Sequence, residues 1–299
     1  MKVRFSCVVD RDPKFIRQAL VWATSLLSYG RQAPESILVH TIGKLDVKYR
    51  RIFDSWGIET YEVQPFDSRH PKSNKLTQLE SEPLYSADYA VLSDCDIAFC
   101  GDISPWIEGD AIRARVASKE GLQRREWAQL FRIAGLELPE FRLGALLSGV
   151  KTLPTYCNGG MYIIPRVILQ SLRGVWCKWD RWLLDHFHGV KPFTAYMDQI
   201  SFAMSCAELR LQIRYLPVEL NFPSLAGTRF RSYGLSGNAT VQPLVLHYHR
   251  TDDRGLLWPS TIASVNKEIE KINSLIDQGR IPYYLAELQS DSPSHAVPD

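Results

Sequence analysis

The sequence lacks any long apolar run. No stretch approaches the roughly 18 consecutive apolar residues that a membrane-spanning helix needs. The first ten residues, MKVRFSCVVD, enter a strand-like segment directly, without the apolar region and small-residue cleavage site of a signal peptide. We therefore expect a soluble, cytoplasmic protein with no transmembrane segment.

A large excess of charge of either sign is also missing. With 35 basic and 33 acidic residues, the formal net charge is only +2. A chain so close to neutral creates no strong field toward nucleic acid or an anionic membrane, so neither is expected as a partner.

Cysteine pairs and a phosphate-binding glycine loop are absent as well. The six cysteines include no C-x-x-C pair, so we expect free, mostly buried thiols and exclude a cysteine-based zinc site. No G-x-x-x-x-G-K-[ST] segment occurs, so phosphate is not held in the P-loop manner.

The chain does contain alternating strand-like and helical patterns. VRFSCVVD, SILVHTIG, IETYEVQPF and DYAVLSDCDIAF predict strands with helical segments between them, and TYCNGGMYIIP, LQIRYLPVELNF and QPLVLHYH predict further strands. Asp198 is predicted to cap a helix that follows it. This rhythm predicts an α/β fold with a mostly parallel central sheet flanked by helices.

A single domain is predicted over residues 1–288, because no internal repeat or long linker divides the chain. A charged helix from about residue 260 closes this domain, and either packs on it or mediates self-association. Residues 136–154 have no clear period and are predicted as a loop, and residues 289–299 as a disordered tail.

Two carboxylates, Asp94 and Asp96, end the apolar run of AVLSDCDIAF. In a continuous strand they share a face, about 6.6 Å apart, at the edge where α/β sheets bind ligands. Neither has a basic neighbour in the sequence, and unpaired buried carboxylates are unfavourable. A divalent cation, Mn²⁺ or Mg²⁺, removes that repulsion. The alternative is a solvated turn or a helix cap, because a D-x-D triplet is short and common.

Other segments place polar groups at the ends of apolar strands. In LVLHYHR, His247 and His249 share a face, and an imidazole there would complete the coordination of a metal. Asp10 follows the first strand and is either a ligand-facing acid or the cap of the next helix. Gly159 and Gly160 either let a sugar approach the backbone or ease a tight strand entry.

The ordered set NKL, AVLSDCDIAF, CNGGMYII, DQ, LNF and LVLHYH, within residues 3–250, resembles nucleotide-sugar-dependent glycosyltransferases of the GT-A (Rossmann-like) fold. The likeness is closest to the retaining family of glycogenin and the bacterial lipooligosaccharide galactosyltransferases. It implies metal-dependent transfer of a sugar from a nucleotide-diphosphate donor, UDP-sugar first, to a hydroxyl acceptor with retention of configuration.

The resemblance also implies a role for each matching residue at the metal and nucleotide end of the site. Asp94 and Asp96 correspond to the aspartates that bind Mn²⁺ and the donor's ribose and diphosphate. His247 corresponds to the third metal ligand. Asp10 corresponds to an acid that contacts the base, and Lys75 to a basic residue that faces the donor.

At the sugar end, the resemblance places Asn158 and Gly159 in the motif that lines the sugar pocket. Asp198 and Gln199 match an acid and an amide near the reacting centre, which makes them the catalytic candidates. No general base is evident from the sequence. An inverting transfer needs one, whereas the retaining transfer that the resemblance implies does not.

The segment after the histidine motif departs from the family. The family has Gly and then KPW, whose lysine contacts the diphosphate, whereas this chain has HYHRTDDRGLLWP, with Arg250 and Arg254 as candidate replacements. The departure keeps a non-catalytic, glycosyltransferase-like binding or scaffold protein as the main alternative. A phosphohydrolase of the haloacid-dehalogenase type and a nucleotidyltransferase fit the motif positions less well.

Overall fold

The computed structural model describes residues 1–117, 121–143, 151–191, 193–224, 240–252 and 254–278, together with residue 281. The strands are β1 (Val3–Val9), β2 (Ile37–Ile42), β3 (Glu59–Val63), β4 (Tyr89–Ser93), β5 (Ile97–Phe99), β6 (Ile112–Val116), β7 (Arg142–Leu143), β8 (Lys151–Thr152), β9 (Cys157–Pro165), β10 (Ile213–Tyr215), β11 (Leu220–Pro223) and β12 (Val245–His247). The helices are α1 (Pro13–Ser28), α2 (Val47–Ser55), α3 (Glu82–Tyr85), α4 (Arg124–Ile133), α5 (Arg166–Phe187), α6 (Phe193–Glu208) and α7 (Ala263–Asp277), with 3₁₀ segments at Pro34–Ser36, Pro71–Glu80 and Ser104–Trp106.

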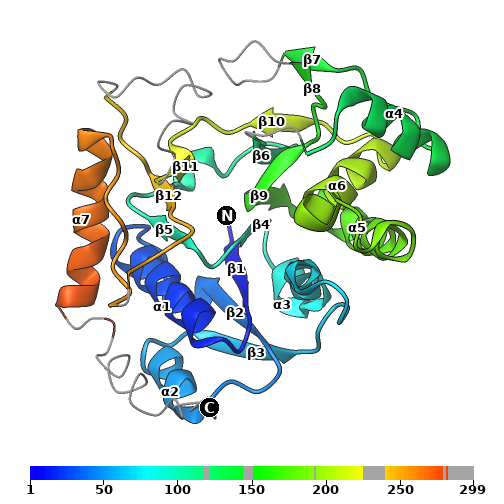
Figure 1. The fold of residues 1–299 in the computed structure, drawn as a ribbon. Coiled ribbons are helices and arrows are strands. Elements are labelled where there is room, and N and C mark those ends of the chain that lie inside the picture. The colour runs from blue at the N-terminus through cyan, green and yellow to red at the C-terminus, as the bar shows by residue number, and fades with distance from the viewer. Residues whose placement is uncertain are drawn as a thin grey trace, which may run out of the picture.

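The central sheet has seven strands in the order β10-β6-β9-β4-β1-β2-β3 (Figure 1). Neighbouring strands are parallel except at β9, which runs antiparallel to both β4 and β6. The predicted α/β class with a mostly parallel central sheet is confirmed. Because β9 is reversed, its first residues lie at the same edge as the carboxyl ends of β1 and β4.

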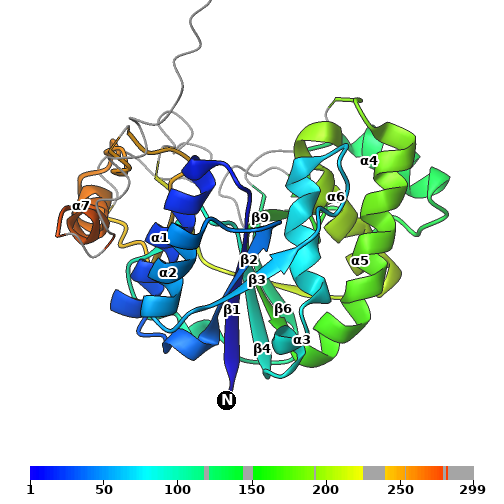
Figure 2. The same ribbon diagram turned by 90° about the horizontal axis from the view of Figure 1, so that it is seen from below.

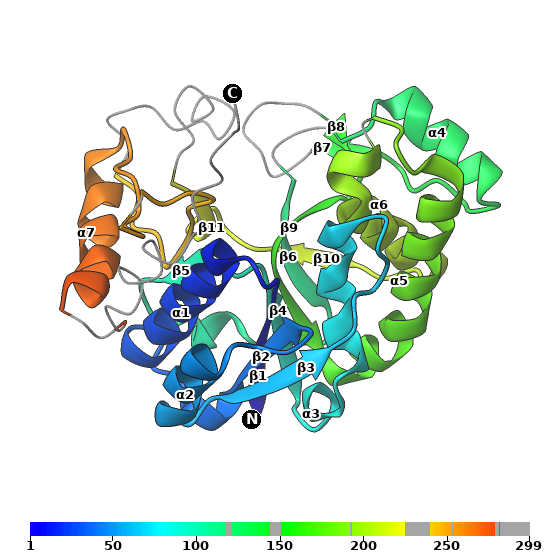
Figure 3. The ribbon, with the colours of Figure 1, turned by 60° about the horizontal axis from the view of Figure 1, so that its bottom comes forward.

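Helices cover both faces of this sheet. The views from below and from an oblique angle place α1, α2 and α7 on one side and α3, α5 and α6 on the other (Figures 2 and 3). Strand side chains alternate between the two faces. Phe5, Cys7 and Val9 of β1 pack into the core beneath α1, and Ala90 and Leu92 of β4 pack into the core against α5. All six cysteines are buried and free, as predicted.

Helix α1 shows how local sequence sets up the site. The Asp12 side chain accepts a hydrogen bond from the Lys14 backbone N–H at 2.8 Å, and Pro13 occupies the first turn, where its missing N–H costs nothing. Because Asp12 is the cap, Asp10 is not, and its carboxylate stays at the end of β1.

Two strand predictions were wrong in the same way. DYAVLSDCDIAF forms two strands, β4 in the central sheet and β5 in a three-stranded sheet of order β11-β12-β5, so Asp94 and Asp96 lie in the connection between sheets and not on one strand face. LQIRYLPVELNF is likewise divided into β10 and β11 of different sheets. Pro217 lies in that second break, where it removes a backbone donor from the ladder.

The predicted role of Asp198 as a helix cap was also wrong. Helix α6 begins earlier, at Phe193, and bends at Tyr196, whose backbone is non-helical (φ −135°, ψ 24°). Asp198 therefore lies within α6, just after the bend.

The charged C-terminal helix packs on the domain. Val265, Ile269 and Ile272 of α7 are buried in the same core as α1, and the two helices lie side by side (Figure 3). None of the described helices is long and apolar enough to cross a membrane. In the predicted loop over 136–154, β7 pairs with β8. Residues 144–150 and the predicted tail 289–299 lie outside the described residues.

Candidate active site

A cavity of about 530 Å³ opens at the carboxyl edge of the central sheet. It lies where β1 and β4 end and β9 begins, beside α6 and the 3₁₀ segment Pro71–Glu80. His249 lines it, together with nine candidate residues for the metal, nucleotide and sugar ends of the site: Asp10, Lys75, Asp94, Asp96, Asn158, Gly159, Asp198, Gln199 and His247. The fold thus gathers segments from both halves of the chain around one space.

Lys75 joins two of the candidate carboxylates. Its Nζ lies 2.8 Å from Asp94 Oδ1 and 2.8 Å from Asp198 Oδ2, and it donates to the Gly159 carbonyl at 3.3 Å. Burial alone would lower the pKa of Lys75, but the two carboxylates raise it above its ordinary value, so the side chain stays charged. The basic partner that Asp94 lacks in the sequence therefore comes from a distant segment.

The glycine at position 159 is required by this close packing. A Cβ at that position would lie 2.7 Å from Lys75 Nζ and 2.8 Å from Asp198 Oδ2. A Cβ at Gly160 would lie 2.7 Å from His247 Nδ1. The observed close neighbours of this glycine pair are side chains of the protein itself, and both glycines lie within β9, so the suggested approach of a sugar stays a prediction.

A buried set of hydrogen bonds fixes the start of α6. The Trp176 indole N–H lies 3.3 Å from the Asp198 carbonyl oxygen and 3.1 Å from Ser201 Oγ. The Ser201 hydroxyl donates to Asp180 Oδ1 at 2.8 Å. Because α5 supplies Trp176 and Asp180, the position of Asp198 is set by the packing of α5 against α6.

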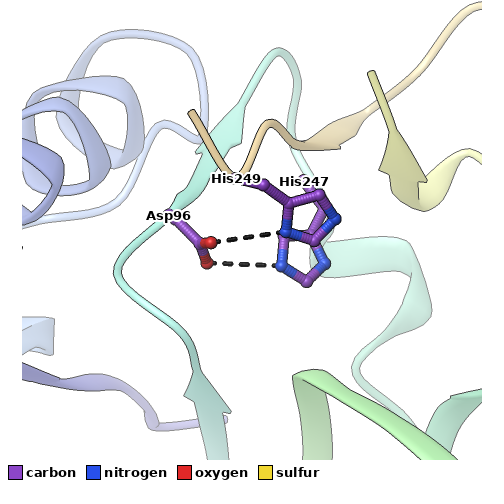
Figure 4. Close-up of side chains that lie close together, drawn as sticks. All are labelled: Asp96, His247 and His249. Carbon is purple, nitrogen blue, oxygen red and sulfur yellow. Dashed lines mark ion pairs between the residues drawn. The ribbon is translucent and has the colours of Figure 1, made fainter. Parts of the chain in front are cut away.

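At the other end of the cavity, two histidines converge on Asp96 (Figure 4). His247 Nε2 lies 3.3 Å from Asp96 Oδ1, and His249 Nδ1 lies 3.4 Å from Asp96 Oδ2. Burial raises the pKa of Asp96, but the two imidazoles outweigh it and hold that pKa well below its usual range. Asp96 is therefore ionised in the folded chain.

The protonation of His247 follows from a chain of amides. The Gly160 backbone N–H can only donate, so the Asn158 atom that it contacts at 2.8 Å is the carbonyl oxygen. That oxygen also accepts from Asn221 Nδ2 at 2.9 Å, which leaves Asn221 Oδ1 facing His247 Nδ1 at 3.0 Å. Nδ1 must therefore carry a proton and donate it to Asn221.

The tautomer of His247 bears on whether the site can bind a metal ion. In neutral His247 the lone pair of Nε2 then faces the Asp96 carboxylate, so two acceptors oppose each other at 3.3 Å. Such a pair needs a second proton on the histidine or a cation between the two. A histidine held by a hydrogen bond on its other nitrogen is the usual arrangement of a metal ligand. The donor set thus fits the divalent cation that the sequence implies.

The two aspartates differ in their surroundings. Asp94 is bound by Lys75, while Asp96 faces the histidines, so the two carboxylates do not share one strand face as expected. Among the residues that the structure describes, Asp96, His247 and His249 have ligand atoms within 4.8 Å of one another. Arg250 and Arg254 were the candidate replacements for the lysine that contacts the diphosphate in the family. Arg254 is exposed and its Nε lies 3.4 Å from Asp252 Oδ2. Among the described residues, neither arginine lines the cavity.

Two residues of the site were not assigned a role from the sequence. For His249 the sequence suggested only that an imidazole at this strand end completes a metal site, without naming it as a ligand, and Asn221 was only a letter of the LNF motif. The signal for His249 was the H-x-H spacing itself. Asn221 had no comparable signal, because its importance depends on a contact with Asn158 across 63 positions of the chain.

Comparisons with solved structures identify the fold. The chain is similar to an active-site mutant of LgtC (TM-score 0.59, 13% identity, 91% of this chain and 95% of that one) and to the galactosyltransferase LgtC in complex with donor and acceptor sugar analogues (TM-score 0.54, 15% identity, 91% and 95%). It is also similar to mouse xyloside xylosyltransferase 1 (TM-score 0.50, 12% identity, 83% and 97%). No protein-family model and no curated protein matches the chain. The chain therefore has the GT-A-like fold that the resemblance predicted.

Proposed function

We propose that this protein is a metal-dependent glycosyltransferase that moves a sugar from a nucleotide-diphosphate donor, UDP-sugar first, to a hydroxyl acceptor with retention. The observation that carries the proposal is the convergence of the nine residues predicted for the metal, nucleotide and sugar ends on one cavity at the sheet edge. The GT-A-like fold, shared with a galactosyltransferase and a xylosyltransferase, supports the same reaction class.

We assign the metal end of the cavity to Asp96 and His247. A Mn²⁺ or Mg²⁺ ion held there would neutralise the negative charge that develops on the departing diphosphate. Asn221 keeps Nε2 of His247 free to act as a ligand. Asp94 Oδ1 pairs with Lys75, so Asp94 would use its other carboxylate oxygen to reach the metal or the donor's ribose.

We assign the sugar end to Asp198, Gln199 and the backbone around Gly159. The Asp198 carboxylate would stabilise the positive charge that develops on the sugar ring, and the Gln199 amide would bind a sugar hydroxyl. Lys75 already binds Asp198 Oδ2, which favours a fixed charge over a free general base. That arrangement supports retention. Asp10, at the end of β1, would face the base.

A thermal-shift panel tests the donor class. Nucleoside diphosphates and nucleotide sugars are added to the wild type and to Asp96→Ala, with and without Mn²⁺, and Asp110→Ala on an exposed carboxylate is the control. A ligand at 100 times its Kd stabilises the folded state by about 2.7 kcal/mol, which raises Tm by several degrees. We expect one nucleotide to stabilise the wild type and Asp110→Ala only with metal, and Asp96→Ala not at all.

The alternative gives the same thermal shifts and is distinguished only by turnover. A scaffold protein without turnover would still bind nucleotide and metal but would not consume the donor sugar. If no nucleotide shifts the wild type, the transferase proposal fails.

A further inference from the structure

One ligand atom from each of Asp96, His247 and His249 lies within 4.8 Å of the other two, so a small movement would let all three hold one ion. Metal bonds of about 2.0–2.2 Å place neighbouring ligand atoms about 3.0–3.5 Å apart. The two imidazole nitrogens lie 3.3 and 3.4 Å from the two carboxylate oxygens of Asp96. Figure 4 shows both rings turned toward that carboxylate. His249 therefore meets the same geometric condition as His247.

The backbone at His249 is bent so that its ring reaches the site. His249 has a positive φ of 56°, and the Arg250 N–H donates to the Tyr248 carbonyl across it at 2.5 Å. A positive φ is uncommon outside glycine and is unfavourable for most side chains. The Tyr248 N–H donates to the Asp96 carbonyl at 3.1 Å, which fixes this turn against Asp96. The turn brings the rings of His247 and His249 to a centroid separation of 3.9 Å, closer than the spacing of about 6.6 Å along a strand.

The other aspartate lies outside this group. Asp94 Oδ1 is held by Lys75 at 2.8 Å, and the cluster found among the described residues combines one carboxylate with two imidazoles. Resting on the metal site proposed above, we infer that His249 is a third protein ligand and that the site binds its cation through two imidazoles and one carboxylate. Imidazole nitrogen favours first-row transition ions, whereas Mg²⁺ prefers oxygen and octahedral geometry. The chain therefore selects a transition ion over Mg²⁺.

Titration with metal alone tests the inference without any nucleotide. Co²⁺ and Mg²⁺ are titrated calorimetrically into the wild type, His249→Asn, His249→Asp and the control His186→Asn, an exposed histidine on α5. Asn and Asp tolerate a positive φ, so both variants at position 249 preserve the turn, and circular dichroism checks the fold. The visible absorption of bound Co²⁺ reports on its ligands independently of affinity.

The wild type and His186→Asn should bind Co²⁺ at least about 100-fold more tightly than Mg²⁺. His249→Asn should weaken Co²⁺ binding by about 10-fold or more and change the absorption of any bound Co²⁺. His249→Asp should recover metal binding with a smaller preference for Co²⁺ over Mg²⁺.

Equal Co²⁺ affinity and spectra in the wild type and His249→Asn would overturn the inference. So would a wild type that binds no Co²⁺ or does not distinguish it from Mg²⁺. If the wild type and His249→Asn bind Co²⁺ equally, Asp96 and His247 remain the proposed ligands and the transferase proposal is unaffected. Failure of the nucleotide panel together with His249-dependent Co²⁺ binding would remove the transferase proposal alone.

Discussion

At the scale of single residues, the site depends on charged groups that are buried in pairs. Lys75 is held between Asp94 and Asp198, and Asp96 between two histidines. Removing one partner of such a group leaves an uncompensated charge in a region with little water. Asp180, behind Asp198, is different: its Oδ1 accepts from Ser201, but among the described residues its Oδ2 has no hydrogen-bond partner.

Asp180 gives a pH-dependent prediction. Burial, with a further contribution from Asp198, raises the pKa of Asp180 from 3.8 to about 6. Between pH 4 and 6 the folded chain holds this proton while the unfolded chain has lost it, so stability falls as pH rises through that window. Asp180→Asn mimics the protonated form. We expect it to match the wild type at pH 4 and to exceed it at pH 8 by up to about 3 kcal/mol.

The free energy of unfolding in urea at pH 4 and pH 8 measures this difference. Asp110→Asn, on an exposed carboxylate, is the control and should behave as the wild type at both values. A stability difference between Asp180→Asn and the wild type that is the same at pH 4 and pH 8 would show that Asp180 does not titrate in this range.

At the scale of elements, the reversed strand β9 and the bent helix α6 shape the cavity. β9 brings its first residues to the edge where β1 and β4 end, and α6 presents Asp198 just after its bend at Tyr196. The Asp94 backbone N–H donates to the Gly160 carbonyl at 3.0 Å, which ties the two sides of the cavity together. A side chain at position 159 of β9 would fit only if the ends of Lys75 and Asp198 moved away.

Two glycine substitutions should therefore have opposite effects. Gly159→Ala forces Lys75 and Asp198 apart, so we expect a loss of about 1–3 kcal/mol in stability and loss of donor binding. Gly174 lies in α5, and a Cβ added there would meet no atom within 4 Å, so Gly174→Ala should stabilise the chain by about 0.5–1 kcal/mol. Urea denaturation measures both. An unaffected Gly159→Ala would contradict the close packing around this glycine.

The elements themselves were largely predictable from local signals. The bounds of α5 match the amphipathic segment RVILQSLRGVWCKWDRWLLDHF, and α1 begins at its predicted proline. The breaks within DYAVLSDCDIAF and LQIRYLPVELNF were not predictable, because each apolar run is continuous and only tertiary pairing divides it between sheets. The bend at Tyr196 could not be predicted, because neither Tyr196 nor its immediate neighbours in the sequence are proline or glycine.

At the scale of the whole molecule, the pairing of strands brings the residues of the site together. His247 reaches Asp96 because β12 pairs antiparallel with β5, which sets His247 opposite Ile97. Motif order led to candidate residues that the structure brings to one cavity, but it did not predict the pairing among them. Which carboxylate meets Lys75 and which meets the histidines depends on contacts between segments far apart in the chain.

The central claim is that this cavity transfers a sugar. Its most direct test is donor turnover: UDP-sugars with Mn²⁺ and candidate hydroxyl acceptors are given to the wild type and to Asp198→Asn, and released nucleoside diphosphate is measured while NMR records the anomeric configuration of the product. We predict a retained configuration and a turnover rate that falls by about 100-fold or more in Asp198→Asn, with donor Kd nearly unchanged. No donor consumption by the wild type, or equal losses of turnover and donor binding in Asp198→Asn, would contradict the account.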